Sequence, residues 1–231
     1  MKVGWEVQPV FSIHLHYKDI VLLHRIKDYF GVGGVCVHKK SESAIFSVQS
    51  VKDCKVIIEH FDKYPLLTQK LADFELFKQA VGILVNKEHL TIEGLHKVVS
   101  IRASMNLGLT EVLTETFPNT IPESRPTVET PEFIDPNWLV GFTDGDGCFL
   151  IHVQNSPKSK LGKQVKIRFQ VSQHERDIAL FKSIILNLKC GTIQTYGNYL
   201  NLSVTRFEDI INIIIPLFKK YRLQGSKRRD F

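Results

Sequence analysis

Two stretches of alternating apolar and polar positions predict β-strands. One covers residues 163–173, and the other covers residues 5–16 with the same period of two. The apolar face of the first stretch consists of Val165, Ile167, Phe169 and Val171. Because the opposite face of each strand is polar, we expect sheets with one buried and one solvated face.

Helical spacing of apolar residues follows each predicted strand. Two of these segments begin at an aspartate in a favourable N-cap position, Asp19 or Asp177. A hairpin with strands at 192–196 and 199–205 is predicted around the Gly197-Asn198 turn. The predicted helices cover residues 19–30, 52–64, 73–87, 91–105, 177–188 and 207–221.

The two halves of the chain repeat one another. Phe11 aligns with Phe169, and Gly33 then aligns with Gly191 at the same offset in residue number. At a slightly smaller offset the matching pairs are Ser47 and Ser203, Tyr64 and Tyr221, Lys70 and Lys227, and Phe74 and Phe231. A repeat of this length indicates one supersecondary unit that occurs twice. The sequence therefore predicts an α+β fold with two pseudo-symmetric units, each an antiparallel sheet with helices on one face.

A stretch rich in proline and acidic residues separates the halves. Five of the nine prolines fall between Pro118 and Pro136, and residues 109–135 hold six acids and one base, Arg125. Such a composition is typical of an extended linker. We therefore predict a first repeat at 1–106, a linker at 107–135 and a second repeat at 136–231.

Composition narrows the class of protein. The whole chain has a net charge of +6, and because residues 109–135 carry −5, the rest of the chain carries +11. A basic surface of this kind suits a polyanionic partner. The four cysteines are far apart, which argues against a disulfide framework or a zinc ribbon. Apolar runs stay below the roughly 18 residues that a membrane span needs, and no targeting signal is recognisable.

The start of the second repeat carries the candidate chemistry. We predict a helix over 136–147 that Asp135 caps, with Gly141 and Gly145 on one face. Two glycines there allow close contact with another helix, although each costs about 1 kcal/mol relative to alanine. Asp146 falls at the C-terminal end, where the helix dipole disfavours a negative charge unless a cation joins it.

This segment resembles the motif of the LAGLIDADG homing endonucleases of the two-repeat, single-chain type. Five of the nine motif positions match: Leu139, Gly141, Asp144, Asp146 and Gly147. The resemblance implies two saddle-shaped sheets that lie along double-stranded DNA, with two motif helices packed together through their glycines.

The resemblance also implies roles for individual residues. Asp146 would bind a divalent cation, Mg²⁺, beside the scissile phosphate, while Lys70 and Lys227 would be basic residues near the cleavage centre and Gln173 would order water. We interpret Asp144 as a structural residue rather than a ligand.

DNA contacts are expected from the polar faces of the sheets, where alternate side chains would reach base edges and phosphates. These residues are Gln8, Ser12, His14, His16, His152, Gln154, Lys166, Arg168, Gln170, Ser172, Tyr199, Asn201, Ser203 and Thr205. We expect His14 and His16 to face DNA rather than to form a metal pair.

The chain departs from the family pattern at both ends. The counterpart of the 136–147 helix would precede residue 1, and residues 75–106 have no counterpart after Phe231. We therefore expect a chain truncated at both ends: a fragment of a longer reading frame, a degenerate product, or a chain whose partner supplies the other motif helix.

Two alternatives to a metal-dependent, site-specific DNA endonuclease use the same fold. One is a maturase that binds intron RNA, and the other is a DNA-binding protein without catalysis. Because the family is commonly encoded in organellar introns, the resemblance implies a mitochondrial location.

Overall fold

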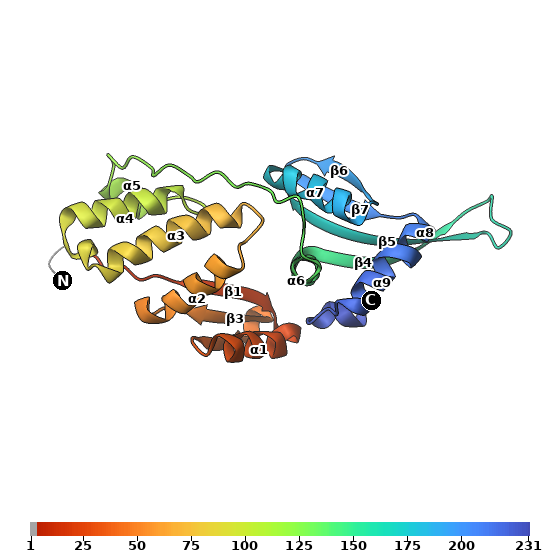
Figure 1. The fold of residues 1–231 in the computed structure, drawn as a ribbon, viewed down its shortest axis with the longest axis horizontal. Helices are drawn as coiled ribbons and strands as arrows, with labels where there is room; N and C mark the ends of the chain where they lie inside the picture. The colour runs from red at the N-terminus through yellow and green to blue at the C-terminus, as the bar shows by residue number, and fades with distance from the viewer. Residues whose placement is uncertain (1–3) are drawn as a thin grey trace. The chain divides into compact units, whose positions relative to one another are not determined.

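The computed structural model describes residues 4–231 and divides them into two compact units, one up to Glu129 and one from Thr130 to Phe231. Each unit contains one antiparallel sheet with helices packed on it (Figure 1). Across residues 4–231, no helix is both long and apolar enough to cross a membrane.

The first unit is built around a three-stranded sheet of order β1-β3-β2. Its elements are β1 (Phe11–His16), α1 (Ile20–Phe30), β2 (Gly34–His38), β3 (Ser43–Val48), α2 (Val51–Lys63), α3 (Lys70–Val85), α4 (Ile92–Ser104) and α5 (Glu111–Thr116). One face of the sheet meets α1, α2 and α3 in a core whose buried members are Leu23, Ala44, Phe46, Val48, Cys54, Ile57 and Val81. The other face carries mainly polar side chains, with Cys36 and Ile45 among them.

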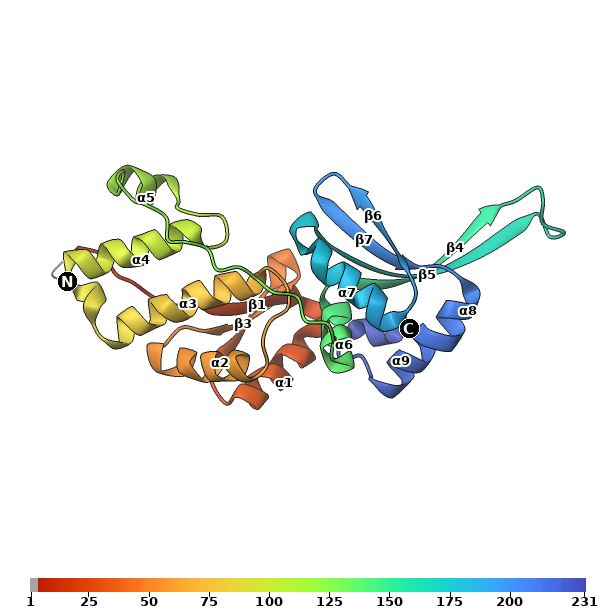
Figure 2. The same ribbon diagram turned by 45° about the horizontal axis from the view of Figure 1, so that its top comes forward.

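The second unit has a four-stranded sheet of order β4-β5-β7-β6. Its elements are α6 (Pro136–Asp146), β4 (Gly147–Asn155), β5 (Lys163–His174), α7 (Ile178–Leu188), β6 (Thr192–Tyr196), β7 (Tyr199–Val204), α8 (Phe207–Asp209) and α9 (Ile215–Lys220). The hairpin of β4 and β5 extends past the other strands of its sheet (Figure 2). Its base is covered by the ring of Phe218, which lies 5.2 Å from that of Phe149 and 5.4 Å from that of Phe169.

Strand register confirms the predicted repeat. The order β1-β3-β2 of the first sheet recurs as β5-β7-β6 in the second. Phe11 pairs with Val48 in the first sheet, and Phe169 pairs with Val204 in the second. The two pairs occupy equivalent positions in the repeat, so each unit folds with the same strand pairing.

The predicted hairpin is also confirmed, since β6 and β7 flank Gly197, whose φ is +56°. Asp19 and Asp177 occupy the N-cap positions of α1 and α7, as predicted, but neither side chain makes a capping hydrogen bond. The turn before each helix is capped instead by the side chain of His16 or His174.

Three predictions about secondary structure need correction. The strand predicted over 5–16 begins only at Phe11, because Pro9 has no N–H to give to a sheet. The helix predicted over 207–221 contains a π-turn at Ile210–Ile214, because Pro216 cannot donate to the carbonyl four residues before it. The predicted linker is not extended throughout, since it contains the short helix α5.

Candidate active site

Helix α6 places the motif residues, and its sequence explains its bounds. The side chain of Asp135 accepts a hydrogen bond from the N–H of Asn137 at 2.7 Å, and Pro136 suits the first helical turn. Leu139, Val140 and Thr143 are buried on one side. The helix ends at Asp146, so that this carboxylate lies where the chain passes into β4.

Asp144 joins α6 to a loop near the end of the chain. Its carboxylate accepts the N–H of Gln224 at 2.7 Å and the N–H of Gly225 at 3.1 Å. Both oxygens are thus used by backbone donors, which is the structural role that the sequence indicated.

The same loop brings Lys227 to the C-terminal end of α6. Its Nζ donates to the carbonyl oxygen of Gly145 at 2.7 Å and lies 3.3 Å from that of Thr143. A cation is favourable there, because the carbonyls of the last helical turn carry the negative end of the helix dipole.

Gln173 of β5 completes the cluster around Asp146. Its Nε2 lies 3.4 Å from Oδ2 of Asp146, and its Oε1 accepts the N–H of His174 at 3.0 Å. Burial raises the pKa of Asp146, and the charge of Lys227 opposes that rise. The second unit thus brings together three of the four predicted catalytic residues.

The donor set of this cluster fits Mg²⁺. That ion is usually bound through one or two carboxylates, with water and substrate phosphate oxygens filling its other positions. Asp146 supplies such a carboxylate, and its raised pKa means that a nearby cation would be favourable. Within residues 4–231 no three His, Cys, Asp or Glu side chains come together, so His14 and His16 have no third ligand of these types.

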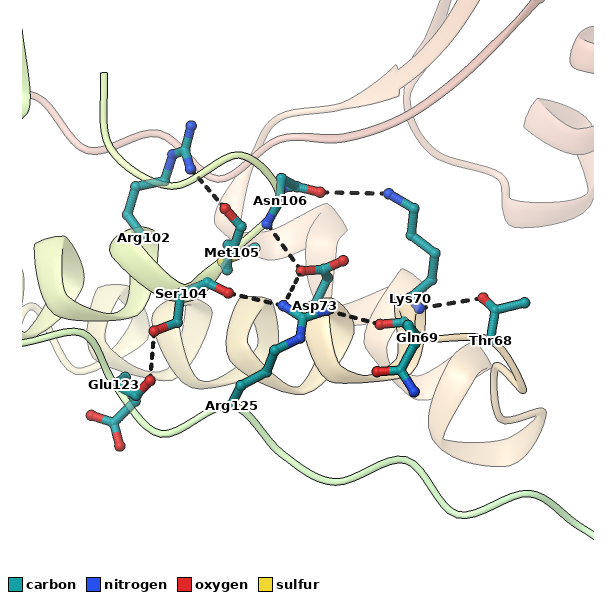
Figure 3. Close-up of polar contacts among 10 residues, drawn as sticks. All are labelled: Thr68, Gln69, Lys70, Asp73, Arg102, Ser104, Met105, Asn106, Glu123 and Arg125. Carbon is teal, nitrogen blue, oxygen red and sulfur yellow. Dashed lines mark hydrogen bonds and ion pairs between the residues drawn. The ribbon is translucent and has the colours of Figure 1, made fainter. Parts of the chain in front are cut away.

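Lys70, the fourth predicted residue, is the equivalent of Lys227 in the first unit. It begins α3, and its Nζ lies 3.5 Å from Oδ1 of Asn106 (Figure 3). Its backbone N–H donates to Oγ1 of Thr68 at 3.3 Å.

Sequence reasoning missed the polar network beside Lys70. Asp73 is buried, and its Oδ1 accepts the N–H of Asn106 at 3.0 Å and Nη1 of Arg125 at 2.7 Å (Figure 3). Burial would raise the pKa of Asp73, but the hydrogen bonds from Arg125 and Asn106 and the charges of Arg125 and Lys70 hold it below its usual value. The one available signal was Arg125 itself, the single base in an acidic stretch.

Most residues predicted to contact DNA do lie on accessible polar faces. Ser12, His14 and His16 are exposed along β1. In the second unit, His152 of β4 pairs with Lys166 of β5, and both are exposed. Apart from Ser203, the other residues predicted to contact DNA are half-buried or exposed: Gln8, Gln154, Arg168, Gln170, Ser172, Tyr199, Asn201 and Thr205.

Hydrogen bonds connect several of these side chains along the second sheet. Arg168 contacts Gln170 at 3.4 Å, Gln170 contacts Ser172 at 3.2 Å, and Ser172 contacts Asn201 at 2.6 Å. Ser203 is an exception among the predicted contacts, because it is only 7% exposed and its side chain is unavailable to a ligand in this conformation. Thr205 lies beyond the end of β7.

The glycine face of α6 is open. A Cβ atom added at Gly141 or at Gly145 would meet no heavy atom of the described residues within 4 Å. The prediction that these glycines pack against another helix therefore stays a prediction.

Comparison with known proteins gives consistent matches over the chain. The sequence profile of the family "LAGLIDADG endonuclease" matches residues 1–81 and 139–231. The chain is 41% identical over 234 residues to probable intron-encoded endonuclease 3 of Neurospora crassa and 36% identical over 244 residues to probable intron-encoded endonuclease 2 of the same fungus. Each match covers 100% of this chain, but only 44% and 52% of the two relatives. The chain thus spans about half the length of these curated relatives.

Two solved structures match the whole described fold. I-SmaMI bound to uncleaved DNA target in the presence of calcium ions is 40% identical, with a TM-score of 0.96 over 99% of this chain and 79% of that one. The LAGLIDADG meganuclease I-CpaMI bound to uncleaved DNA is 43% identical, with a TM-score of 0.93 over 98% of this chain and 79% of that one.

Proposed function

Because this chain belongs to the LAGLIDADG endonuclease family, we propose that it serves in site-specific hydrolysis of double-stranded DNA. The observation that carries the proposal is the cluster at the end of α6, where Gln173 and Lys227 lie around the carboxylate of Asp146 and the helix carbonyls. The relatives named as intron-encoded endonucleases and the DNA-bound structural neighbours support it.

Asp146 is the residue that would hold Mg²⁺. The bound ion would polarise the scissile phosphate and lower the pKa of a water molecule, which supplies the nucleophile. Asp146 suits this role because its carboxylate lies at a helix end that is poorly matched to an anion, where a bound cation would offset the cost of its charge.

Gln173 and Lys227 would assist the hydrolysis in two ways. Gln173 holds Oδ2 of Asp146 while the N–H of His174 fixes its own carbonyl, so the carboxylate keeps one orientation. The water-ordering role of Gln173 remains part of this proposal. The ammonium group of Lys227 would offset negative charge that develops on the phosphate.

The polar sheet faces would select the DNA site. One face of β5 carries, in order, Lys166, Arg168, Gln170 and Ser172. The two cations can contact phosphates, and the amide and hydroxyl groups can contact base edges. A two-stranded ribbon such as that of β4 and β5 can enter the major groove, where all four base pairs are distinguishable.

A mitochondrial location is also part of the proposal. Its support is the naming of relatives as intron-encoded, including a protein in ND4 intron 1 of Podospora anserina that is 47% identical over 90 residues.

The test is cleavage of DNA sites selected from a randomised library, with this chain and, in parallel, Asp146→Asn and the surface control Asp28→Asn. We expect Mg²⁺-dependent nicking or cleavage with wild type and Asp28→Asn, and its loss with Asp146→Asn while DNA binding is retained. Equal cutting by Asp146→Asn would contradict the role of Asp146. Promotion of intron splicing that survives Asp146→Asn would instead support a maturase, and binding without cutting would support a non-catalytic DNA-binding protein.

A further inference from the structure

The linker arginine Arg125 lies at the centre of a polar network around the start of α3. Its Nη1 donates to Oδ1 of Asp73 at 2.7 Å and to the carbonyl of Ser104 at 2.9 Å, and its Nη2 donates to the carbonyl of Gln69 at 3.0 Å (Figure 3). One planar guanidinium therefore joins the residue before Lys70 to the end of α4.

The partners of Arg125 are the groups that determine where Lys70 stands. Gln69 is the N-cap residue of α3, and Lys70 is its first helical residue. On the other side, Asp73 accepts the N–H of Asn106, whose side-chain oxygen faces Nζ of Lys70 at 3.5 Å. Arg125 thus fixes the backbone that carries Lys70 as well as the side chain that meets its ammonium group.

The chemistry of these contacts requires an arginine. A guanidinium offers several donors in one plane and serves a carboxylate and two carbonyls together, whereas the ammonium of lysine acts as a point charge. Asp73 is 7% exposed, so its charge needs the partner that Arg125 supplies. Asn106 has a φ of +50°, a conformation that asparagine tolerates better than most residues.

We propose that Arg125 is a positioning residue for Lys70 and acts through Asp73, Gln69 and Asn106. The inference rests on the proposed function, in which Lys70 assists cleavage. The linker is then part of the catalytic apparatus of the first unit rather than a spacer between two units.

The first experiment tests positioning without DNA. It follows the NMR signal of the Lys70 side-chain ammonium group, identified by its loss in Lys70→Met. We expect Arg125→Lys to shift or broaden this signal. Asn106→Gly should have a similar effect, because it removes the facing side chain and leaves a backbone that glycine adopts easily. Asn106→Asp keeps an acceptor but adds a negative charge, so its signal should stay narrow at a changed chemical shift, in contrast to the broadening expected in Asn106→Gly. Arg206→Lys, at an arginine with surface ion pairs only, is the matched control.

The second experiment is a double-mutant cycle on single-turnover cleavage, at a temperature where denaturation curves show every variant folded. We expect Lys70→Met to slow cleavage by about tenfold or more, and Arg125→Lys by about three- to tenfold because it misplaces that group. In the Lys70→Met background, Arg125→Lys should have almost no further effect.

The outcomes separate the two proposals. An unshifted Lys70 signal in Arg125→Lys, or independent additive effects of the two substitutions on cleavage, would overturn the positioning role. Cleavage that is absent in wild type, or unaffected by Lys70→Met, would count against the proposed function or against the part of Lys70 in it, while the NMR result would still decide whether Arg125 positions Lys70.

Discussion

The carboxylate of Asp144 accepts the backbone N–H of Gln224 at 2.7 Å, although the two residues are far apart in the sequence. This bond ties the end of the motif helix to the loop that leads to Lys227. One of the two acids in the motif therefore places the lysine, while the other acid, Asp146, faces the proposed metal.

Removal of that tie should separate Lys227 from α6. Asp144→Ala leaves two backbone donors without their acceptor, so we expect a loss of about 1–3 kcal/mol in the free energy of unfolding and slower cleavage. Asp144→Asn keeps one acceptor oxygen, so it should lose less free energy of unfolding and less cleavage activity. Urea denaturation and cleavage assays would check this. Equal effects of Ala and Asn would contradict the geometry, since only Ala removes both oxygens.

Asp146→Asn should separate stability from activity. Because burial raises the pKa of Asp146, its ionised form is disfavoured in the folded, metal-free chain at neutral pH. An amide has no charge to desolvate, so the thermal midpoint without metal should stay level or rise even as cleavage is lost. A markedly lower midpoint measured by circular dichroism would show that the carboxylate stabilises the fold instead.

Alanine should lower the stability of the fold at one glycine and raise it at two others. At Gly94 a Cβ would lie too close to the carbonyl oxygen of Glu88, so Gly94→Ala should cost about 2–4 kcal/mol. Gly141 and Gly145 have open space, so alanine there should stabilise the chain by up to about 1 kcal/mol each through helix propensity. Denaturation curves would measure both effects.

The predicted role of the α6 glycines gives a second readout for the same variants. If Gly141 and Gly145 receive another helix, as their spacing predicts, their alanine variants should be more stable as free chains and yet poorer in cleavage. Alanine variants that gain stability and cut DNA at the wild-type rate would exclude a close helix contact at these positions.

Acid should destabilise the chain partly through Asp73. Its folded-state pKa is held below the ordinary 3.8, so its contribution to stability is complete above that value and is lost as pH falls through the lower, folded value. Asp73→Asn should be less stable at pH 7, by about 2–4 kcal/mol, and should lose less additional stability between pH 5 and pH 3. Parallel urea titrations across this range would check both parts, and equal acid sensitivity of the two proteins would contradict them.

Periodic features were recoverable from the sequence because they repeat. Alternation located β5, and the matching of Phe11 with Phe169 anticipated the shared strand pairing of both sheets. The motif residues located Asp146 at a helix end for a different reason, because spacing and capping are local properties of the sequence.

Features that depend on single long-range contacts were not recoverable. The hydrogen bonds of Gln224 with Asp144 and of Arg125 with Asp73 join residues that no periodicity relates. A single base in an acidic linker does not indicate which residues it contacts. The π-turn before Pro216 was missed for another reason, because the missing N–H alters the hydrogen bonding of a segment that keeps its helical apolar pattern.

The anchoring of the linker has a consequence for protein engineering. On one side it is held by Arg125, and on the other the carbonyl of Pro131 accepts Oγ of Ser183 at 2.7 Å and the N–H of Ile134 donates to Asn187 at 3.0 Å. A peptide tag or a second domain is therefore best inserted within residues 126–130, between these anchors. The same insertion a few residues earlier would displace the guanidinium that reaches Asp73. The position of an insertion, more than its length, would therefore decide whether the fold around Lys70 is kept.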